Sequence, residues 1–304
     1  MNFTAKDVSD LRAQTGIGMM ECKKALTEAN GDKEEAIKIL REKGLAVAAK
    51  KANRIAAEGK VAIKATADGK KSAVIEVNCE TDFAAKTDKF VEFIDKLLDI
   101  VLETGVADVE ALLAAKFDAE NTVDDYLKKE VINSIGENIS IRRFQVVEGL
   151  NSSYVHGGGT IGVIVTGETT GDEAVAKEVL KNLALQAAAM NPKYLDRESV
   201  PASVIEAEKE IVLAQIKNDE KNANKPEAVL EKMVTGKVAK YYTENCLMEQ
   251  EYVKGDKETC AKYVAGAAKE LKVTGFIRFE KGEGIEKKEE DYAAEVAKLA
   301  GGNN

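Results

Sequence analysis

The sequence predicts an α+β protein in which antiparallel sheets and helices recur in two similar units. Residues 59–66 and 71–79 alternate polar and apolar side chains with period two, and Asp68-Gly69 between them is a strong hairpin-turn signal. Residues 90–101 instead place apolar side chains three and four positions apart, which is the spacing of an amphipathic helix. A second hairpin-plus-helix pattern occupies residues 152–192. Because both patterns recur, we expect a duplicated α+β core with antiparallel sheets.

Residues 1–54 are predicted to form three short helices. The first ends at Gly16 and the second at Asn30-Gly31, a left-handed capping signal. The third begins after Asp32, which serves as its N-cap, and ends at Gly44. So compact a three-helix unit resembles the small ubiquitin-associated type of bundle. The Ala- and Lys-rich stretch that follows is expected to be a helical or flexible connector.

The two core units share a strand sequence. The second unit reads GVIVTGET at 162–169, which lines up residue for residue with VIEVNCET at 74–81. The copies then diverge, because Thr81 is followed by Asp-Phe whereas Thr169 is followed by Thr-Gly. The first copy therefore carries a feature that the second lacks.

Pro201 and Pro226 each open a long polar helix with a narrow apolar stripe. A short Asn-rich turn joins the two helices, which are predicted to form an antiparallel coiled-coil hairpin protruding from the core. A strand at 273–284 and a helix at 289–301 follow. The expected parts are a three-helix domain (1–54), two core subdomains (55–148 and 149–200), the coiled-coil hairpin (201–262), and the returning core strand with a C-terminal module (263–304).

Composition disfavours several classes of protein. The 304 residues include 44 basic and 53 acidic side chains, and this net charge of −9 argues against a dedicated nucleic-acid binder. The four cysteines show no CxxC spacing, which favours reduced thiols over a disulfide framework. No leader sequence or bilayer-spanning apolar run is recognisable, so we expect a cytoplasmic protein that does not associate with membranes. His156 is the single histidine, which disfavours hydrolases, metalloenzymes and any His-based metal site.

Several motifs have a simple structural interpretation. Residues 157–162 match GxGxxG, but a dinucleotide site needs a strand before the motif and a helix after it, and here a strand follows. We interpret the motif as a glycine-rich hairpin turn and expect no bound cofactor. His156 is either a polar turn residue, the commoner case, or a contact residue. Met19-Met20 is either a contact surface or, as spacing favours, ordinary packing. Arg12 is expected to be a solvated charge.

Phe83 has two alternative environments. If the helix at 90–101 extended back to residue 83, Phe83 would share the phase of Phe90 and Leu97 and would be buried, and spacing slightly favours this alternative. Thr87-Asp88 is nevertheless the better helix start, since threonine is a good N-cap and an acidic first turn suits the helix dipole. A start there would leave Phe83 at the tip of a loop.

Five stretches closely resemble, in the same order along nearly the whole chain, the bacterial elongation factor Ts family. They are TGIGMMECKKALTEANGD with AIKILREKG, NCETDFAAKTDKF, GENISIRR, YVHGGGTIGVIV and TGFIRFEKGEGIEK. The resemblance implies a guanine-nucleotide exchange factor without covalent chemistry. Its partner would be elongation factor Tu, the GTPase that delivers aminoacyl-tRNA to the ribosome. It also implies the fold expected above.

The resemblance assigns roles to individual residues. In the family a Thr-Asp-Phe loop inserts into Tu near the nucleotide-bound magnesium. That loop corresponds to Thr81, Asp82, Phe83 and Ala84, although the family commonly has valine at the last of these positions. The matching motifs also imply partner contacts at Arg12, Met19, Met20, Ile135, Gly136 and His156.

The implied mechanism is displacement of Mg²⁺ and the phosphate-binding elements of Tu–GDP, which releases GDP and allows GTP to rebind. Tu would be bound both with GDP and without nucleotide, and a homodimer could form through the coiled-coil hairpin. Two other functions stay open on the residues alone. One is a docking adaptor that uses the N-terminal bundle and the coiled coil, and the other is a nucleotide-dependent enzyme.

Overall fold

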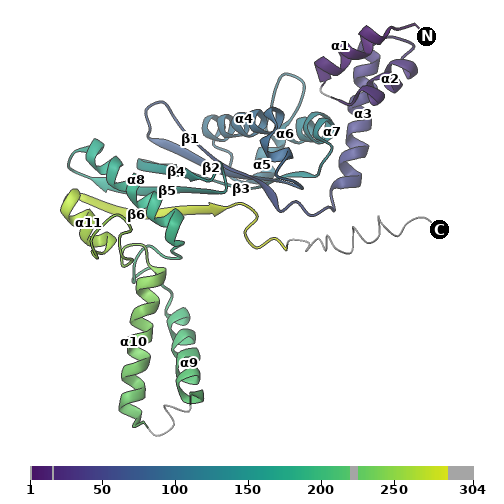
Figure 1. Ribbon diagram of the computed structural model, residues 1–304. Helices are drawn as coiled ribbons and strands as arrows, with labels where there is room; N and C mark the ends of the chain where they lie inside the picture. The colour runs from purple at the N-terminus through teal and green to yellow at the C-terminus, as the bar shows by residue number, and fades with distance from the viewer. Residues whose placement is uncertain (1, 16, 220–224, 287–304) are drawn as a thin grey trace. The chain divides into compact units, whose positions relative to one another are not determined.

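The computed structural model describes residues 2–15, 17–219 and 225–286. The chain divides into two compact units, which are described separately below. One unit comprises Met1–Ala62, Ile75–Phe144 and Glu280–Asn304, and the other comprises Ile63–Val74 and Gln145–Phe279. Helices precede two three-stranded antiparallel sheets and further helices follow, so the predicted α+β fold class is confirmed (Figure 1).

Three helices open the first unit and share a small core. They are α1 (Ala5–Thr15), α2 (Met19–Glu28) and α3 (Lys33–Lys51). The core is built from the apolar residues of one face of each helix, among them Leu11, Cys22, Ala25, Leu26 and Leu40. The predicted N-cap Asp32 is confirmed, because its carboxylate accepts hydrogen bonds from the N–H groups of Glu34 and Glu35. The predicted end of the first helix at Gly16 lies outside the described residues.

The prediction that Gly44 ends the third helix is wrong. α3 continues through Gly44 to Lys51 and takes up much of the Ala- and Lys-rich connector. Alanine and lysine are strong helix formers, whereas one interior glycine costs about 1 kcal/mol relative to alanine. A Cβ atom at Gly44 would lie 2.9 Å from the carbonyl oxygen of Lys129. The glycine therefore allows α3 to pack closely against the segment Leu127–Val131.

The first sheet has the order β1-β2-β3, with bounds Glu58–Ala65, Lys71–Cys79 and Ile139–Glu148. The central strand β2 is buried from its second residue onward. It leads through a loop and the 3₁₀ turn η1 (Ala84–Lys86) into α4 (Asp88–Thr104). All the apolar residues predicted to face inward on this helix are buried, namely Phe90, Phe93, Ile94, Leu97, Leu98 and Val101.

A continuous helical segment follows α5 (Val109–Ala114) and positions the turn that later supports the candidate site. It consists of α6 (Val123–Tyr126), a π-helical turn η2 (Leu127–Val131) and α7 (Ile132–Ile135). Thr122 caps it, because its hydroxyl accepts a hydrogen bond from the Asp125 N–H at 3.2 Å. The segment ends where Gly136 adopts a left-handed conformation with φ 85°.

The second unit contains the sheet β4-β5-β6, with bounds Leu150–His156, Ile161–Thr169 and Leu271–Glu280. β4 and β5 are antiparallel, and their register runs from Leu150 opposite Gly167 to His156 opposite Ile161. The turn between them is Gly157-Gly158-Gly159, in which all three residues have positive φ. A strand therefore both precedes and follows the GxGxxG pattern, which confirms the hairpin-turn interpretation and not a dinucleotide motif.

α8 (Glu173–Met190) packs against β4 and β5, and its inner face joins the core of the second unit. The long helices α9 (Ala202–Asn218) and α10 (Glu227–Asn245) lie side by side, each opened by the predicted proline (Figure 1). Few of their residues are buried, since only Ile205, Val212 and Ile216 of α9 and Val238 of α10 are. The residues that join the two helices (220–224) and the predicted C-terminal helix (289–301) lie outside the described residues. A short helix, α11 (Cys260–Ala267), precedes β6.

Replacing Asp172 by alanine is expected to destabilise the protein by about 1 kcal/mol, because Asp172 caps α8. Its carboxylate accepts hydrogen bonds from the N–H groups of Ala174 (2.7 Å) and Val175 (3.2 Å). Urea unfolding measures the loss. Glu178→Ala removes an exposed carboxylate from the same helix without touching the cap, and should leave the unfolding midpoint nearly unchanged. Equal midpoints for the two variants would show that the cap contributes nothing.

Candidate functional site

The loop that carries Phe83 lies between β2 and α4. Thr87 begins the helix, since its hydroxyl accepts a hydrogen bond from the Phe90 N–H at 3.4 Å. The turn η1 before Thr87 breaks the helical phase, so Phe83 lies outside α4 and exposes 79% of its surface. The buried alternative, which spacing slightly favoured, is therefore wrong. The structure agrees with the capping argument for a helix start at Thr87.

Glu137 holds the start of this loop. Its carboxylate accepts two hydrogen bonds from Thr81, one from the backbone N–H at 2.9 Å and one from the hydroxyl at 2.6 Å. The Thr81 hydroxyl oxygen in turn accepts a hydrogen bond from the Ala84 N–H at 3.2 Å. Both Ala84 and the neighbouring Ala85 are buried. One side of the turn is thus anchored, and Phe83 is left on the solvent side.

A buried cysteine supports the same residue from the strand. The Cys79 thiol lies 3.1 Å from the carbonyl oxygen of Thr81 and donates a hydrogen bond to it. Burial raises the pKa of Cys79 to about 12, so the sulfur keeps its proton at neutral pH. The thiol therefore acts as a structural donor and not as a nucleophile.

Asp82 is an exposed, ionised carboxylate at the loop tip. Lys86 donates a hydrogen bond to it at 2.6 Å and, with the positive charge of the same ammonium group, lowers the pKa of Asp82. The Lys86 ammonium group also lies 5.8 Å from the centroid of the Phe83 ring. Aromatic, acidic and basic groups are consequently presented together to solvent.

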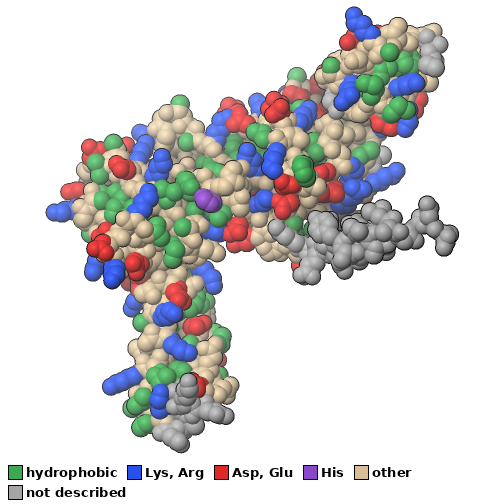
Figure 2. Space-filling view, viewed as in Figure 1, with side chains coloured by type: hydrophobic (Ala, Val, Ile, Leu, Met, Phe, Trp, Pro, Cys, Tyr) green, Lys and Arg blue, Asp and Glu red, His purple; other side chains and the backbone are tan. Residues whose placement is uncertain are grey.

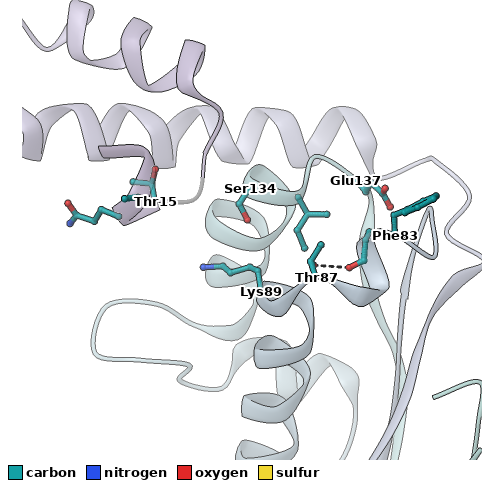
Figure 3. A pocket seen from close by; sticks show the side chains of 10 residues that line it. Thr15, Phe83, Thr87, Lys89, Ser134 and Glu137 are labelled. Atoms are coloured by element: carbon teal, nitrogen blue, oxygen red, sulfur yellow. Dashed lines mark hydrogen bonds between the residues drawn. The ribbon is translucent and has the colours of Figure 1, made fainter. Parts of the chain in front are cut away.

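A surface hollow of ≈ 560 Å³ lies beside the loop (Figure 3). Its walls come from α1, the loop with η1, the start of α4, and the end of α7 with the following turn. Of the residues predicted to contact a partner, Phe83, Ala84 and Ile135 line this hollow. Ala84 is only 3% exposed, so its side chain supports the loop from inside in the free molecule.

The other predicted contact residues of the first unit are mostly at the surface. Arg12 is exposed, as expected for a solvated charge, and Gly136 is also exposed. Met19 and Met20 expose 47% and 63% of their surface, so the prediction that they are ordinary packing residues is wrong. The side chains of Cys22, Ala25 and Leu26 already fill the helical core from the same helix.

His156 belongs to the second unit, at the end of β4. It is exposed, and the histidine colour is visible at the surface in Figure 2. Its Nδ1 atom lies 3.0 Å from the hydroxyl oxygen of Tyr154. The residue is thus a polar turn residue that is also accessible for contact. His156 belongs to the second unit, whereas the Phe83 loop belongs to the first.

The chemistry of these residues is that of protein recognition. In the described part of the chain, no cluster of three or more His, Cys, Asp or Glu side chains could hold a metal ion, and no helix is long and apolar enough to cross a bilayer. All four cysteines are free and buried. Burying an exposed phenylalanine gains about 1.5–3 kcal/mol. An exposed aromatic ring beside an open hollow has the features of a protein-recognition surface.

Comparison with known proteins identifies the family. The family model described as elongation factor TS matches residues 80–283. The chain is 48% identical to elongation factor Ts of Clostridium perfringens, over 98% of this chain and 99% of that protein. It is 49% identical to elongation factor Ts of Clostridium kluyveri, over 97% and 98%, and 46% identical to that of a Nitratiruptor species, over 98% and 99%. The chain belongs to the elongation factor Ts family, whose members are nucleotide exchange factors for elongation factor Tu and not enzymes with covalent chemistry.

Sequence reasoning missed the residues that support the loop. Lys86 could have been found, because it follows Asp82 by four positions and such pairs commonly form ion bridges. Glu137 left no local signal, since it lies 56 positions from the threonine that it binds. The sequence predicted that Cys79 is a reduced thiol but not that this thiol donates a hydrogen bond to Thr81.

Proposed function

We propose that this chain promotes GDP release from elongation factor Tu by inserting the loop Thr81, Asp82, Phe83 and Ala84 beside the Mg²⁺ of Tu. The observation that carries the proposal is the 79% exposure of Phe83 in a loop anchored on its other side. A large aromatic side chain at the surface is available to fill a pocket on a partner, where aromatic anchors dominate binding energy. An anchored loop also loses little conformational entropy on binding.

Phe83 and Asp82 have different roles at the loop tip. Phe83 wedges between side chains of Tu, and the ionised Asp82 accepts hydrogen bonds that fix the loop against its partner. Mg²⁺ is the largest local charge in a nucleotide site, so moving the groups that hold it weakens GDP binding strongly. The chain itself supplies no covalent step.

Linkage requires the coupling to act in both directions. If the chain binds nucleotide-free Tu more tightly than Tu–GDP, it must weaken GDP binding by the same factor. GTP, which is in cellular excess, then binds the vacated site and expels the chain. The chain thus cycles between GDP-bound and nucleotide-free Tu.

A second contact surface supports docking. Arg12, Met19, Met20, Ile135 and Gly136 belong to the first unit, and all except the half-buried Ile135 are exposed. Methionine side chains adapt easily to an irregular partner surface. His156, in the second unit, is proposed as a further contact with the phosphate-binding side of Tu.

Replacing Met19 and Met20 together by serine is expected to weaken Tu binding about tenfold, because two exposed apolar contacts are lost. The maximal rate of GDP release at saturation should stay close to that of the wild type, since the loop is intact. A titration of the release rate against chain concentration separates the two quantities. Met190→Ser removes a methionine of similar exposure (46%) outside the proposed surface and should change neither. A double variant that binds as well as the wild type would exclude this surface.

We also propose that the chain has the domain architecture implied by the family. α1–α3 correspond to a ubiquitin-associated-like bundle, and α9 with α10 to an antiparallel coiled-coil hairpin. A duplicated core is supported by β2 and β5, because each is the central strand of its sheet and each leads to a long helix. The domain limits are those proposed from the sequence.

A homodimer through the hairpin is supported by the exposed Ile211 (52%) and Val229 (41%) on α9 and α10. Size-exclusion chromatography with light scattering tests it. We further propose that the chain acts in the cytoplasm, where Tu delivers aminoacyl-tRNA.

Dissociation of labelled GDP from Tu tests the proposed function directly. The chain should accelerate GDP release when excess unlabelled nucleotide is present. A docking adaptor would instead be retained on immobilised Tu without changing the release rate, and that result would overturn the proposal. Equilibrium dialysis of the isolated chain against GDP and GTP tests the enzyme alternative, for which nucleotide binding to the chain alone is required.

A further inference from the structure

We propose that Glu137 is a positioning residue that sets the exposed geometry of the Phe83 loop and thereby the efficiency of nucleotide exchange, an inference that rests on the proposed function. The residue touches neither Phe83 nor Asp82 through a hydrogen bond. It acts through Thr81, whose backbone N–H and hydroxyl both donate to its carboxylate. Hydrogen bonds to an ionised acceptor are roughly twice as strong as neutral ones.

The turn that carries Glu137 is held from two other directions. On one side, Lys51 at the end of α3 donates to the carbonyl oxygen of Gly136, and the Asn138 side chain donates to the carbonyl oxygen of Arg54 at 2.7 Å. On the other side, the Asn138 N–H donates to the carboxylate of Glu80 at 2.6 Å. The turn Gly136–Glu137–Asn138 therefore links the end of α3 to the residues that follow β2. Glu137 is thus fixed by its neighbours and can fix the loop in turn.

The loop has few other restraints of comparable strength. The pair Asp82–Lys86 is 52% and 72% exposed on its side chains, and exposed ion pairs contribute little. The Cys79 thiol is a weak donor, although it is well placed. Phe83 makes no buried contact that would hold the loop, since it is 79% exposed. Beside the packing of the buried Ala84 and Ala85, the two hydrogen bonds to Glu137 are therefore the main polar tie between the loop and the rest of the unit.

The effect of Glu137 on nucleotide exchange depends on how often the loop adopts its productive orientation. If the loop samples several orientations, only the fraction with the productive one can engage Tu, and the apparent affinity falls by that fraction. Glu137 and Phe83 also line the same hollow, so a displaced loop would change the shape of the surface that Tu meets (Figure 3). Removal of Glu137 should thus reduce exchange without touching the contact side chains themselves.

Three variants test the proposal in the full-length chain. Glu137→Ala removes both acceptors and is expected to lower the efficiency of GDP release about tenfold, mainly through weaker apparent binding. Glu137→Gln keeps an oxygen for the Thr81 N–H and offers an N–H to the Thr81 hydroxyl oxygen, so it should rescue release to within about threefold of the wild type. Thr81→Val keeps the N–H but removes the hydroxyl, so its efficiency of GDP release should lie between those of Glu137→Ala and Glu137→Gln. Glu103→Ala removes an exposed carboxylate from α4 and should behave like the wild type.

A second readout reports on the loop without Tu. Hydrogen–deuterium exchange of the free chain should be about tenfold faster at the Thr81 and Ala84 amides in Glu137→Ala, and near wild-type in Glu137→Gln. Circular dichroism confirms that each variant is folded. If Glu137→Ala does not fold, Thr81→Val and Glu137→Gln carry the test.

The outcomes separate the two proposals. In one outcome, Phe83→Ala accelerates GDP release from Tu less than the wild type does, while Glu137→Ala matches the wild type both in GDP release and in hydrogen–deuterium exchange of the loop amides. The role of Glu137 is then overturned and the proposed function stands. If Phe83→Ala releases GDP at the wild-type rate, the proposed function fails and the role of Glu137 in exchange fails with it. Both the proposed function and the role of Glu137 would be supported if Glu137→Ala showed slower GDP release from Tu and faster hydrogen–deuterium exchange of the loop amides, and if Glu137→Gln restored both.

Discussion

Replacing Phe83 by alanine is expected to slow GDP release from elongation factor Tu at least tenfold, with little change in the stability of the chain. The ring is 79% exposed in the free molecule, so its removal opens no cavity there. Truncating an aromatic anchor in an interface commonly costs about 2 kcal/mol or more, which corresponds to about thirtyfold. Stopped-flow release of a fluorescent GDP from Tu, at several chain concentrations, measures the loss.

Two variants make this result specific. Phe83→Tyr keeps the ring and should retain most of the activity. Val91→Ala shortens another exposed apolar side chain (37%) on the outer side of α4, and should release GDP as the wild type does. If the wild type and Phe83→Ala accelerated GDP release from Tu equally, the ring could not be the wedge that opens the nucleotide site.

Replacing Glu76 by glutamine is expected to destabilise the protein by about 3 kcal/mol at pH 7. The side chain is fully buried, and its carboxylate accepts hydrogen bonds from Arg142 (2.9 Å), Arg143 (2.6 Å) and the Gly282 N–H (2.8 Å). Removing one partner of a buried ion pair costs about 3–5 kcal/mol because the other charges lose their compensation. The lower end applies here, since Arg142 and Arg143 are 27% and 31% exposed. Urea unfolding measures the difference.

The destabilisation should depend on pH in a defined direction. Burial alone would raise the pKa of Glu76, but the hydrogen bonds from Gly282, Arg142 and Arg143 outweigh burial and lower it below the usual 4.5. A carboxylate with a lowered pKa stabilises the folded state above its unfolded pKa, and this contribution is lost as pH falls through the folded pKa. The difference between wild type and Glu76→Gln should therefore be full at pH 7 and shrink as pH falls below 4.5.

Glu283→Gln is the matched control for this cluster. Glu283 also pairs with Arg143, at 3.1 Å, but its side chain is 49% exposed. Its loss should cost less than about 1 kcal/mol. If Glu76→Gln were as stable as Glu283→Gln, or if its defect did not change between pH 7 and pH 4, the buried carboxylate would not contribute as described.

Regular periodicity and turn chemistry predicted much of the fold. Every apolar residue that spacing assigned to the inner face of α4 is buried, and the glycine run after His156 forms a hairpin turn. Gly44 shows where local signals fail. A glycine just after the last periodic apolar residues predicts a helix end, but the close approach of Lys129 makes a glycine necessary inside α3. Tertiary packing, which spacing alone does not contain, decides between the two.

The candidate site could be predicted only in part. Helical phase and capping chemistry gave opposite environments for Phe83, and the structure follows the cap at Thr87. The loop is held by Glu137 across 56 positions of sequence, a contact for which no local pattern exists. The spacing of Met19 and Met20 favours packing in the core, but other residues of α2 already fill this core, and both methionines are exposed.

The Mg²⁺ dependence of GDP release tests the central claim most directly. If the Phe83 loop acts by displacing the groups that hold Mg²⁺ on Tu, its advantage should vanish once chelation has already removed the cation. At saturating chain and with Mg²⁺ present, the wild type should release GDP at least tenfold faster than Phe83→Ala, and in excess chelator the two rates should agree within about twofold. A ratio that stays the same with and without Mg²⁺ would contradict this mechanism.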